Sequence, residues 1–354
     1  MEEGSLINIK KHTLKSRFFL APINTGLALK GNPTKDLISF HELRSNQYTG
    51  INYVGNVAID TEKVTNANTL FINSSMENYK KLASAIEKKG SIAGVQIACF
   101  KSKYETLRTW KNKNPDSYID LIKSEMSSLK YTELKVIIQS FQASIIKLYN
   151  LGFRAIQLHG AHGYFLNNFL SETFNNRSDE FGKDRTLIIK EILNGIRQIS
   201  TDCIIDLRIS LFENKIEHKL DTKHIDFLNT ISNIHGLDIV SISNGVYNID
   251  KQLIYPLKNA GEVFMLNILS DYLKTKPGIL WNISGNVRNL NRLKNEEANI
   301  TFAIGRPLIA DPGFIKKQLE NHMSEIVECE YKNKCHYFSR SKGFIECGVN
   351  KKVF

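Results

Sequence analysis

The chain alternates short apolar segments with amphipathic ones, and this alternation repeats eight times along its 354 residues. A short apolar run fits a buried strand, and the amphipathic segment after it fits a helix packed on one face. A closed parallel barrel requires eight such units, and no stretch between them reads as an interdomain linker. The sequence therefore predicts a single-domain α/β fold, the (β/α)8 TIM barrel. The expected strands cover residues 17–22, 51–59, 92–100, 153–159, 203–210, 237–243, 278–285 and 300–305.

Helical periodicity is clearest in three of the connecting segments. Apolar residues recur at spacings of three and four within 134–149, 187–199 and 261–275, which is the pattern of a helix with one buried face. The segments 39–47 and 77–88 show the same pattern less regularly.

One connection departs from this pattern. About thirty mostly polar residues between Lys101 and Tyr131 follow the third expected strand, and a loop of that length in a compact domain is usually functional or mobile. In a barrel, the connections that follow the strands surround the active site. We therefore expect a long loop here, which is either a lid over the active site or a surface insertion.

Charge and cysteine content limit the class of protein. The formal net charge is +11, but lysine is spread along the whole chain, whereas a nucleic-acid-binding protein usually gathers its basic residues on one face or tail. We therefore expect no nucleic-acid partner. We also expect no membrane partner, because no apolar run approaches the ~20 residues that span a bilayer. The N-terminal segment lacks the apolar core of a secretory signal. Five cysteines do not suggest a disulfide framework, so a reducing cytoplasm is the expected location.

Polar and glycine-bearing residues stand at the carboxyl ends of the expected strands, where a barrel places its active site. Three residues with polar rings, His159, His162 and Tyr164, follow the fourth strand within six positions. The last two strands end in the sequences Ser-Gly-Asn at 284–286 and Gly-Arg at 305–306. Glycine lets backbone N–H groups approach an anion closely, and an arginine adds a charged donor. These two strand ends together predict a site for a phosphorylated cofactor or substrate.

Three stretches carry a resemblance to a known family. Residues 151–182 read LGFRAIQLHGAHGYFLNNFLSETFNNRSDEFG, which resembles the fourth-strand signature of the old yellow enzymes, a family of FMN-dependent NADH:flavin oxidoreductases and ene-reductases. Residues 21–45 read APINTGLALKGNPTKDLISFHELRS and resemble the opening of that family. Residues 302–317 read FAIGRPLIADPGFIKK and resemble its end. The likeness runs over about 6–318 and is strongest to the branch of bacterial 2,4-dienoyl-CoA reductase.

The resemblance implies an FMN cofactor on the rim of the barrel. By this match, Gln96 would bond the pyrimidine edge of the flavin, Ala58 would let the ring lie flat, and Arg208 would sit by N1 and the C2 carbonyl. A fixed positive charge at that place would favour the reduced, anionic flavin. The other implied cofactor-binding residues are Pro22, Ile23, Asn24 and Thr25 near the ring, with Gly285, Asn286, Gly305 and Arg306 at the phosphate.

The same resemblance assigns roles to the rings after the fourth strand. His159 and His162 would bind a carbonyl oxygen of the substrate, and Tyr164 would donate a proton to the α-carbon of an electron-poor alkene while the β-carbon accepts hydride. NADH or NADPH would reduce the FMN in the same pocket, in a ping-pong cycle with this small-molecule electrophile. Two alternatives stay open: flavin-dependent amine oxidation or demethylation on the same barrel, and a non-catalytic FMN-containing binding protein. Self-association into a homo-oligomer, common in this family, is also left open.

The segment after the barrel departs from these relatives. We expect an FMN-binding barrel over 1–320 and a C-terminal extension over 321–354. Relatives in the dienoyl-CoA reductase branch hold an iron–sulfur cluster on four cysteines in this extension, whereas this chain has Tyr331 where one ligand is expected. Three thiolates are short of the four that a cluster ordinarily uses. His336 could replace the fourth ligand, but we expect a degenerate motif that holds neither an iron–sulfur cluster nor another metal. The three cysteines are Cys329, Cys335 and Cys347.

Overall fold

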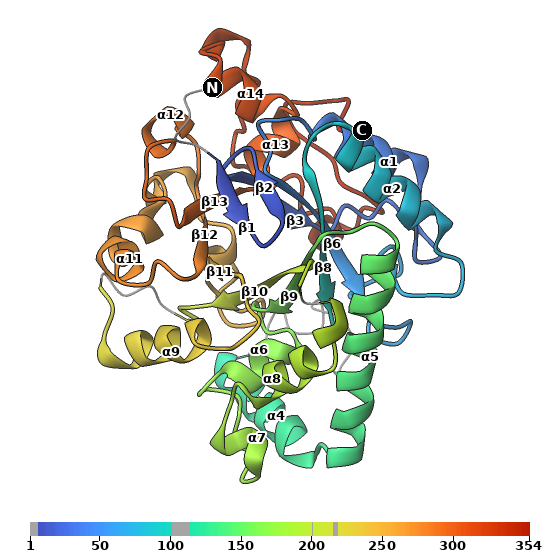
Figure 1. Cartoon of the computed structure of the whole chain (residues 1–354), viewed down its shortest axis with the longest axis vertical. Helices are drawn as coiled ribbons and strands as arrows, with labels where there is room; N and C mark the ends of the chain where they lie inside the picture. The colour runs from blue at the N-terminus through green and yellow to red at the C-terminus, as the bar shows by residue number, and fades with distance from the viewer. Residues whose placement is uncertain (1–5, 101–113, 200, 215–218) are drawn as a thin grey trace.

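The computed structural model describes residues 6–100, 114–199, 201–214 and 219–354. Its central sheet is made of parallel strands and closes on itself, because the first barrel strand pairs with both the last and the second. Figure 1 shows these strands at the centre of the molecule, with helices around them. The predicted (β/α)8 barrel is confirmed. Its strands are β3 (Phe18–Ile23), β6 (Ile51–Ala58), β8 (Ile92–Ala98), β9 (Ala155–Gly160), β10 (Ile204–Ser210), β11 (Ile239–Ser243), β12 (Leu280–Ser284) and β13 (Ile300–Ile304).

The strands are covered on both faces. Every residue of β6, β9, β11 and β13 is buried, because helices pack on the outside and side chains from other strands fill the inside. Strands in this position read as continuous apolar runs and not as an alternation of apolar and polar residues. This is why the strand segments can be recognised in the sequence.

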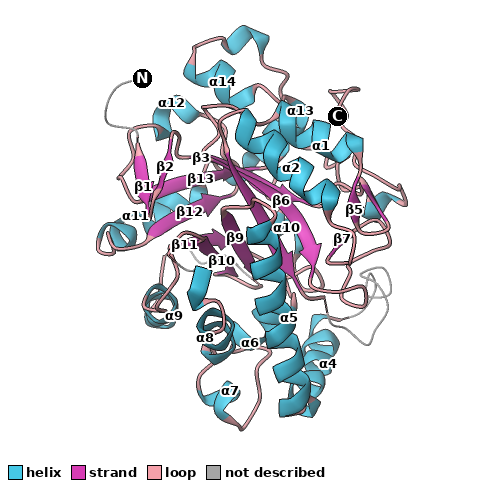
Figure 2. Ribbon diagram, turned by 45° about the vertical axis from the view of Figure 1, so that its right-hand side comes forward, coloured by secondary structure: helices cyan, strands magenta, loops and turns pink. Residues whose placement is uncertain are grey.

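The helices lie on the outside of the strands, as Figure 2 shows. Two of them, α2 (Glu77–Lys88) and α5 (Tyr131–Asn150), cover the segments that periodicity predicts. Helix α1 (Lys35–Leu43) begins earlier than expected, because the side chain of Thr34 accepts a hydrogen bond from the N–H of Leu37 and caps the helix there.

The connections after the later strands are also helical. Helix α8 (Leu187–Asn194) stops short of the expected end at residue 199, and a separate 3-10 turn at Arg197–Ile199 follows it. The remaining helices are α6 (Phe165–Leu170), α7 (Glu180–Lys183), α9 (Thr222–Ser232), α10 (Lys251–Ile254), α11 (Phe264–Lys274), α12 (Leu290–Leu293), α13 (Arg306–Ala310) and α14 (Phe314–Leu319). Among the described helices, we find none that combines the length and the apolar character needed to cross a lipid bilayer.

The prediction of a long loop before Tyr131 is wrong in its second half. Residues Pro115–Ser128 form helix α4, whose N-cap Asn114 accepts a hydrogen bond from the N–H of Asp116. An N-cap asparagine, a proline at the first helical position and an acidic first turn are start signals for a helix. The first half, 101–113, lies outside the described residues, so the choice between a lid and an insertion stays a prediction for that part.

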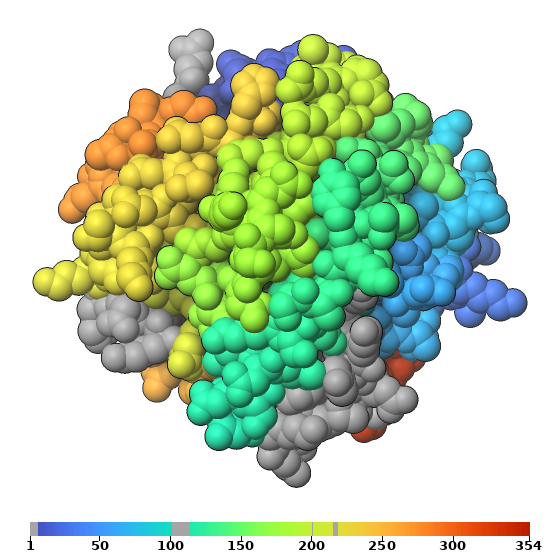
Figure 3. All heavy atoms as spheres, turned by 90° about the horizontal axis from the view of Figure 1, so that it is seen from below, coloured from blue at the N-terminus to red at the C-terminus, as the bar shows by residue number. Residues whose placement is uncertain are grey.

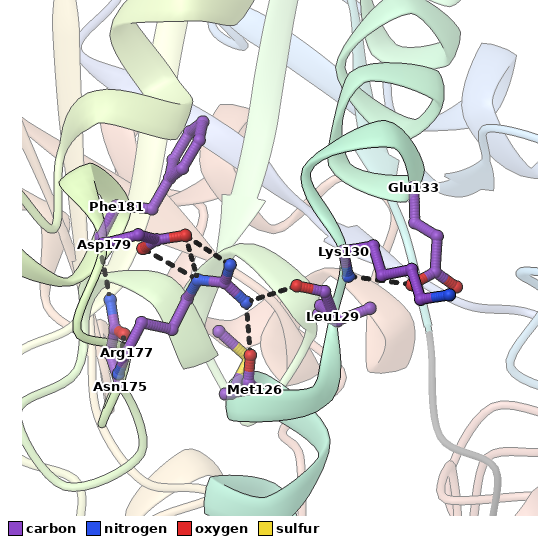
Figure 4. Close-up of polar contacts among 8 residues, drawn as sticks. All are labelled: Met126, Leu129, Lys130, Glu133, Asn175, Arg177, Asp179 and Phe181. Carbon is purple, nitrogen blue, oxygen red and sulfur yellow. Dashed lines mark hydrogen bonds and ion pairs between the residues drawn. The ribbon is translucent and has the colours of Figure 1, made fainter.

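Helix α4 is held against the segment that follows β9. The guanidinium of Arg177 donates to the carbonyl oxygens of Met126 and Leu129, at 2.9 Å for the latter, and forms an ion pair with Asp179 (Figure 4). Figure 3 shows the teal surface of α4 beside the lime-green surface of the segment after β9. Arg177 thereby satisfies carbonyl groups that the end of a helix leaves without partners.

The amino-terminal end of the barrel is closed by a hairpin. Strands β1 (Ile7–Ile9) and β2 (His12–Leu14) pair antiparallel, and their apolar side chains join those of the strand starts in one cluster. Leu14, Phe19 and Tyr53 are completely buried in this cluster. Water is therefore excluded from this end of the barrel.

The C-terminal extension is bound to the barrel. After α14 ends at Leu319, residues 321–354 contain two short 3-10 turns, Met323–Glu325 and Phe338–Arg340. The buried guanidinium of Arg44, at the end of α1, donates to the carbonyl oxygens of Leu308 and Val353 at 2.7 and 3.0 Å. The first helical connection, the last one and the end of the chain are thus joined by one side chain.

Candidate active site

A cavity of about 600 Å³ opens at the carboxyl ends of the strands, a volume within the range of ligand-binding sites. Each of the eight strands contributes at least one residue to its wall, so the cavity lies at the end where barrel enzymes place their chemistry. These residues include Pro22 (β3), Asn56 (β6), Gln96 (β8), His159 (β9), Arg208 (β10), Ser243 (β11), Ser284 (β12) and Ala303 (β13).

All but two of the residues predicted for the site lie in the wall of this cavity. They come from segments as far apart as the first and the last strand. The residues are Pro22, Ile23, Asn24, Gln96, His159, His162, Tyr164, Arg208, Gly285, Asn286, Gly305 and Arg306.

Thr25 and Ala58 are the two residues that are not in the wall. The hydroxyl of Thr25 accepts from the N–H of Leu27 at 3.3 Å and so shapes the turn after β3. Ala58 is completely buried at the end of β6. The pairing of β6 with β8 shifts register between Val54 and Val57, and Asn56 is the residue of β6 that reaches the cavity. The sequence interpretation missed Asn56, because it took the flavin contact of this strand from the resemblance, which pointed to Ala58.

The three rings after β9 lie close together. The ring centroid of His159 is 5.1 Å from that of His162 and 4.2 Å from that of Tyr164. A turn through His162, whose φ is 65°, brings the chain back across the strand end. Ser210 fixes this turn, because its hydroxyl accepts from the N–H of His162 at 3.0 Å.

Both histidines are neutral in this environment. Burial, and then the positive charge of Arg208, lower the pKa of His159 and of His162 well below the ordinary value. The Nε2 atom of His162 lies 2.8 Å from the hydroxyl of Ser243, while the buried Nδ1 atom of His159 has no hydrogen-bond partner among the described residues. The pair therefore offers uncharged hydrogen-bonding nitrogens at neutral pH.

Arg208 is a partly buried cation whose charge is poorly compensated. It donates one hydrogen bond, to the hydroxyl of Ser243 at 3.2 Å, and its Nε atom is buried without a partner in the described part of the chain. Burial lowers its pKa, and the nearby carboxyl of Asp206 opposes that shift. A buried charged donor without a partner is costly, so this group fits an acceptor on a bound ligand.

The ends of β12 and β13 form a second polar region of the wall. Gly285 has a φ of 112°, which a glycine adopts without strain. At Gly305, apart from its two chain neighbours, no atom of the described residues lies within 4 Å of the place that a Cβ would occupy, so the backbone there is open to a ligand. Arg306 is held in place by hydrogen bonds to Pro256 O at 2.6 Å and to Asn286 Oδ1 at 3.2 Å.

The C-terminal extension completes the wall. Tyr337 donates to the side-chain oxygen of Asn24 at 2.8 Å, and the ring of His336 lies 3.8 Å from that of Tyr255, centroid to centroid. The Tyr255 and Tyr247 hydroxyls are 2.6 Å apart. The sequence interpretation missed these residues. The only sequence feature that could have indicated their place in the wall was the aromatic cluster His-Tyr-Phe at residues 336–338.

The three cysteines of the extension lie together beside this wall. They line a small neighbouring pocket of about 30 Å³, together with Tyr331. Burial raises the pKa of Cys335 to about 11 and also raises that of Cys329, so these thiols are protonated at neutral pH. Within the described ranges, no group of three or more histidine, cysteine or acidic side chains is arranged to hold a metal ion. The expectation that this motif holds no cluster stays a prediction.

The wall fits the parts of an FMN molecule. The amide of Gln96 and the unpartnered Nε of Arg208 suit the polar edge of a flavin ring. The open backbone at Gly305 and the guanidinium of Arg306 suit a phosphate. A TIM barrel with these groups at its carboxyl end belongs to the class of flavin-binding barrel oxidoreductases.

Comparison with known proteins identifies the family. Residues 6–325 match the model of the NADH:flavin oxidoreductase / NADH oxidase family, and the chain belongs to this family. Its relatives include an NADPH dehydrogenase of Bacillus cytotoxicus, 25% identical over 353 residues that cover 96% of this chain and 97% of that protein. The chain is accordingly an NAD(P)H-dependent oxidoreductase of the old yellow enzyme family, as the resemblance predicts.

Solved structures share the fold. A 2-naphthoyl-CoA reductase in complex with 2-naphthoyl-CoA superposes with a TM-score of 0.82 at 19% identity, over 98% of this chain. This chain spans 56% of that enzyme's chain. The old yellow enzyme of Pichia sp. AKU4542 superposes with a TM-score of 0.66 at 15% identity, covering 89% of this chain and 86% of that one.

Proposed function

We propose that this protein uses FMN and NADH or NADPH to reduce an electron-poor alkene that carries a carbonyl or an equivalent acceptor group. The observation that carries the proposal is the meeting of a partly buried cation, two neutral histidines and a buried phenol at one cavity. These groups are Arg208, His159, His162 and Tyr164.

The cofactor would be held at two places on the wall. Gln96 and Arg208 would contact the polar edge of the flavin ring, and residues 22–24 would lie beside the ring. Gly305 and Arg306 would bind the phosphate. Bound FMN supplies reversible hydride transfer between the nicotinamide and the substrate. Because both reactants need the same face of the ring, they would enter the cavity in turn.

His159 and His162 would bind the substrate oxygen. Because their pKa values are lowered, they are uncharged donors at neutral pH. Negative charge grows on the substrate oxygen when the β-carbon accepts hydride, and fixed donors stabilise that charge without having to reorganise. His159 lines the cavity, and its Nδ1 atom makes no hydrogen bond to the described residues.

Tyr164 would donate the proton to the α-carbon. Its ring is buried, and burial raises the pKa of its hydroxyl above 10, so the phenol carries its proton throughout the physiological range. A weak acid is sufficient, because the α-carbon becomes strongly basic as hydride adds to its neighbour. The hydroxyl of Thr65 lies 3.1 Å from that of Tyr164 and orients it.

The test separates the two half-reactions under anaerobic conditions. In Tyr164→Phe, reduction of the bound flavin by NADH or NADPH should proceed at nearly the wild-type rate, because no proton from Tyr164 is needed. Reoxidation by cyclohexenone should be slower by about 10²- to 10⁴-fold, the usual contribution of a general acid. An equal loss in both half-reactions would refute the role of Tyr164. A wild-type protein that binds no FMN would refute the proposed function as a whole.

A further inference from the structure

A row of hydrogen-bonded polar side chains crosses the interior of the barrel. The amide of Gln96 donates from Nε2 to Gln157 Oε1 at 2.7 Å, and Gln157 Nε2 donates to Asp206 Oδ2 at 2.6 Å. The hydroxyl of Ser241 donates to the same carboxylate oxygen at 2.8 Å. These residues lie on the neighbouring strands β8, β9, β10 and β11. Of the four, only Gln96 lines the cavity.

The carboxylate determines the direction of every hydrogen bond in this row. A carboxylate only accepts, whereas an amide can turn over and exchange its donor and acceptor ends. Gln157 must direct its NH₂ group at Asp206, so its oxygen faces Gln96 and can only accept. Gln96 must then direct its NH₂ group at Gln157. This leaves the oxygen of Gln96 and its second N–H for the cavity.

We propose that Asp206 is a positioning residue, which fixes the amide of Gln96 in the one orientation that matches the polar edge of the flavin. That edge presents a carbonyl, an N–H and a second carbonyl in order, so it needs an acceptor beside a donor. The inference rests on the proposed binding of FMN at Gln96. Asp206 itself does not touch the cofactor and acts through Gln157.

The surroundings of Asp206 keep it charged in spite of its burial. The side chain is completely buried, and burial raises its pKa to about 6. Gln157, Ser241, the phenol of Tyr53 and the guanidinium of Arg208 all face the carboxyl and oppose that rise. The carboxylate form therefore predominates at pH 7, and the orientation of the row is maintained.

The test compares FMN affinity among variants of the full chain. In Asp206→Asn the new amide can serve either as donor or as acceptor, so Gln96 is free to turn over, and FMN should bind about tenfold more weakly, the loss expected for one hydrogen bond. The variant should fold, because it replaces a buried charge by a neutral group of the same shape. The matched control is Asp238→Asn, which neutralises a carboxylate at the closed end of the barrel, bonded to Ile205 N at 2.8 Å. Its FMN affinity should be unchanged.

A second variant moves the charge instead of removing it. In the double variant Gln157→Glu with Asp206→Asn, the carboxylate at residue 157 accepts directly from Gln96 and restores its orientation. FMN affinity should return to within about threefold of wild type. Asp206→Asn binding FMN as tightly as wild type, or no recovery in the double variant, would overturn the inference alone. Wild-type protein that binds no FMN would overturn the proposed function and, with it, this inference.

A measurement on the wild-type protein covers the case in which Asp206→Asn does not fold. Riboflavin has no phosphate to titrate, so its binding between pH 5 and 7 reports on the protein. Protonation of Asp206 near its pKa of about 6 should weaken riboflavin binding about tenfold at pH 5. Binding that is constant over this range would overturn the inference.

Discussion

The two ends of the barrel are built from the same eight strands, but one end is closed by apolar side chains and the other opens into a cavity with polar walls. At the amino-terminal end, Leu14 of the hairpin lies in one apolar cluster with Phe19 and Tyr53, and all three are completely buried. At the carboxyl end, the strands contribute polar groups to a cavity, and among the described residues Arg208 Nε and His159 Nδ1 have no hydrogen-bond partner there. The closed end is filled by apolar side chains, whereas the open end presents polar groups to a space that a ligand can enter.

The difference shows where stability and function reside in this fold. Apolar burial at the closed end contributes free energy of folding in proportion to the area removed from water. Unpartnered polar groups at the open end cost free energy until a ligand meets them. Substitutions at the two ends should therefore have separable effects, and three variants examine this separation.

The largest effect is expected from Leu14→Ala at the closed end. A completely buried leucine truncated to alanine leaves a cavity, and the free energy of unfolding should fall by about 2–5 kcal/mol. Urea denaturation measures this loss, and FMN titration of the folded variant should give the wild-type affinity. The control is Leu6→Ala in the same region, because Leu6 is 54% exposed and should matter little. A large change in FMN affinity in Leu14→Ala would show that the two ends are coupled.

The next effect is expected from Arg208→Ala at the open end. Loss of charged hydrogen bonds to the flavin should weaken FMN binding about 10- to 100-fold and lower the reduction potential of the bound flavin, because a positive charge beside the anionic reduced form is lost. The free energy of unfolding of the apoprotein should not fall, since the variant removes a partly buried charge that makes one hydrogen bond to the described residues.

Arg17 provides the matched control for Arg208. It lies before β3 at the closed end, where it donates to the carbonyl oxygens of Glu296 and Ile300 at 2.7 and 3.2 Å. Arg17→Ala should destabilise the protein and leave the FMN affinity unchanged. Equal weakening of FMN binding by both alanine variants would contradict the placement of Arg208 at the flavin.

The barrel strands were predictable from sequence, because burial on two faces gives apolar runs with a clear beginning and end, whereas the hairpin that closes the amino-terminal end was not predicted. The place of Gln96, Arg208 and the rings of His159, His162 and Tyr164 in the site followed from the positions of these residues on the strands or directly after them. Asn56 did not, because the family resemblance assigned the contact of β6 to Ala58, whereas Asn56 is the residue of that strand in the cavity wall.

Two parts of the structure were missed for different reasons. Helix α4 carried its signal in the sequence: it begins at an Asn-Pro-Asp capping sequence, and its buried residues Tyr118, Ile122 and Met126 recur at a spacing of four, but they stand in a mostly polar stretch for which the sequence interpretation predicts a loop. The extension places Tyr337 in the wall through a hydrogen bond to Asn24, 313 positions away. No local pattern indicates a partner so distant.

The smallest effect is expected from Thr65→Val. This variant separates, within the open end, the contribution of one hydrogen bond from that of packing. Valine keeps the shape of threonine but cannot share a hydrogen bond with the hydroxyl of Tyr164, so the phenol keeps its place and loses its fixed direction. Reoxidation of the reduced enzyme by cyclohexenone should slow about three- to tenfold, corresponding to one neutral hydrogen bond of about 1 kcal/mol, while reduction by NADPH is unchanged. Thr65→Ser, which restores the hydroxyl, should restore the rate. If serine fails to restore it, the loss comes from packing, and Thr65 has no part in orienting the proton donor.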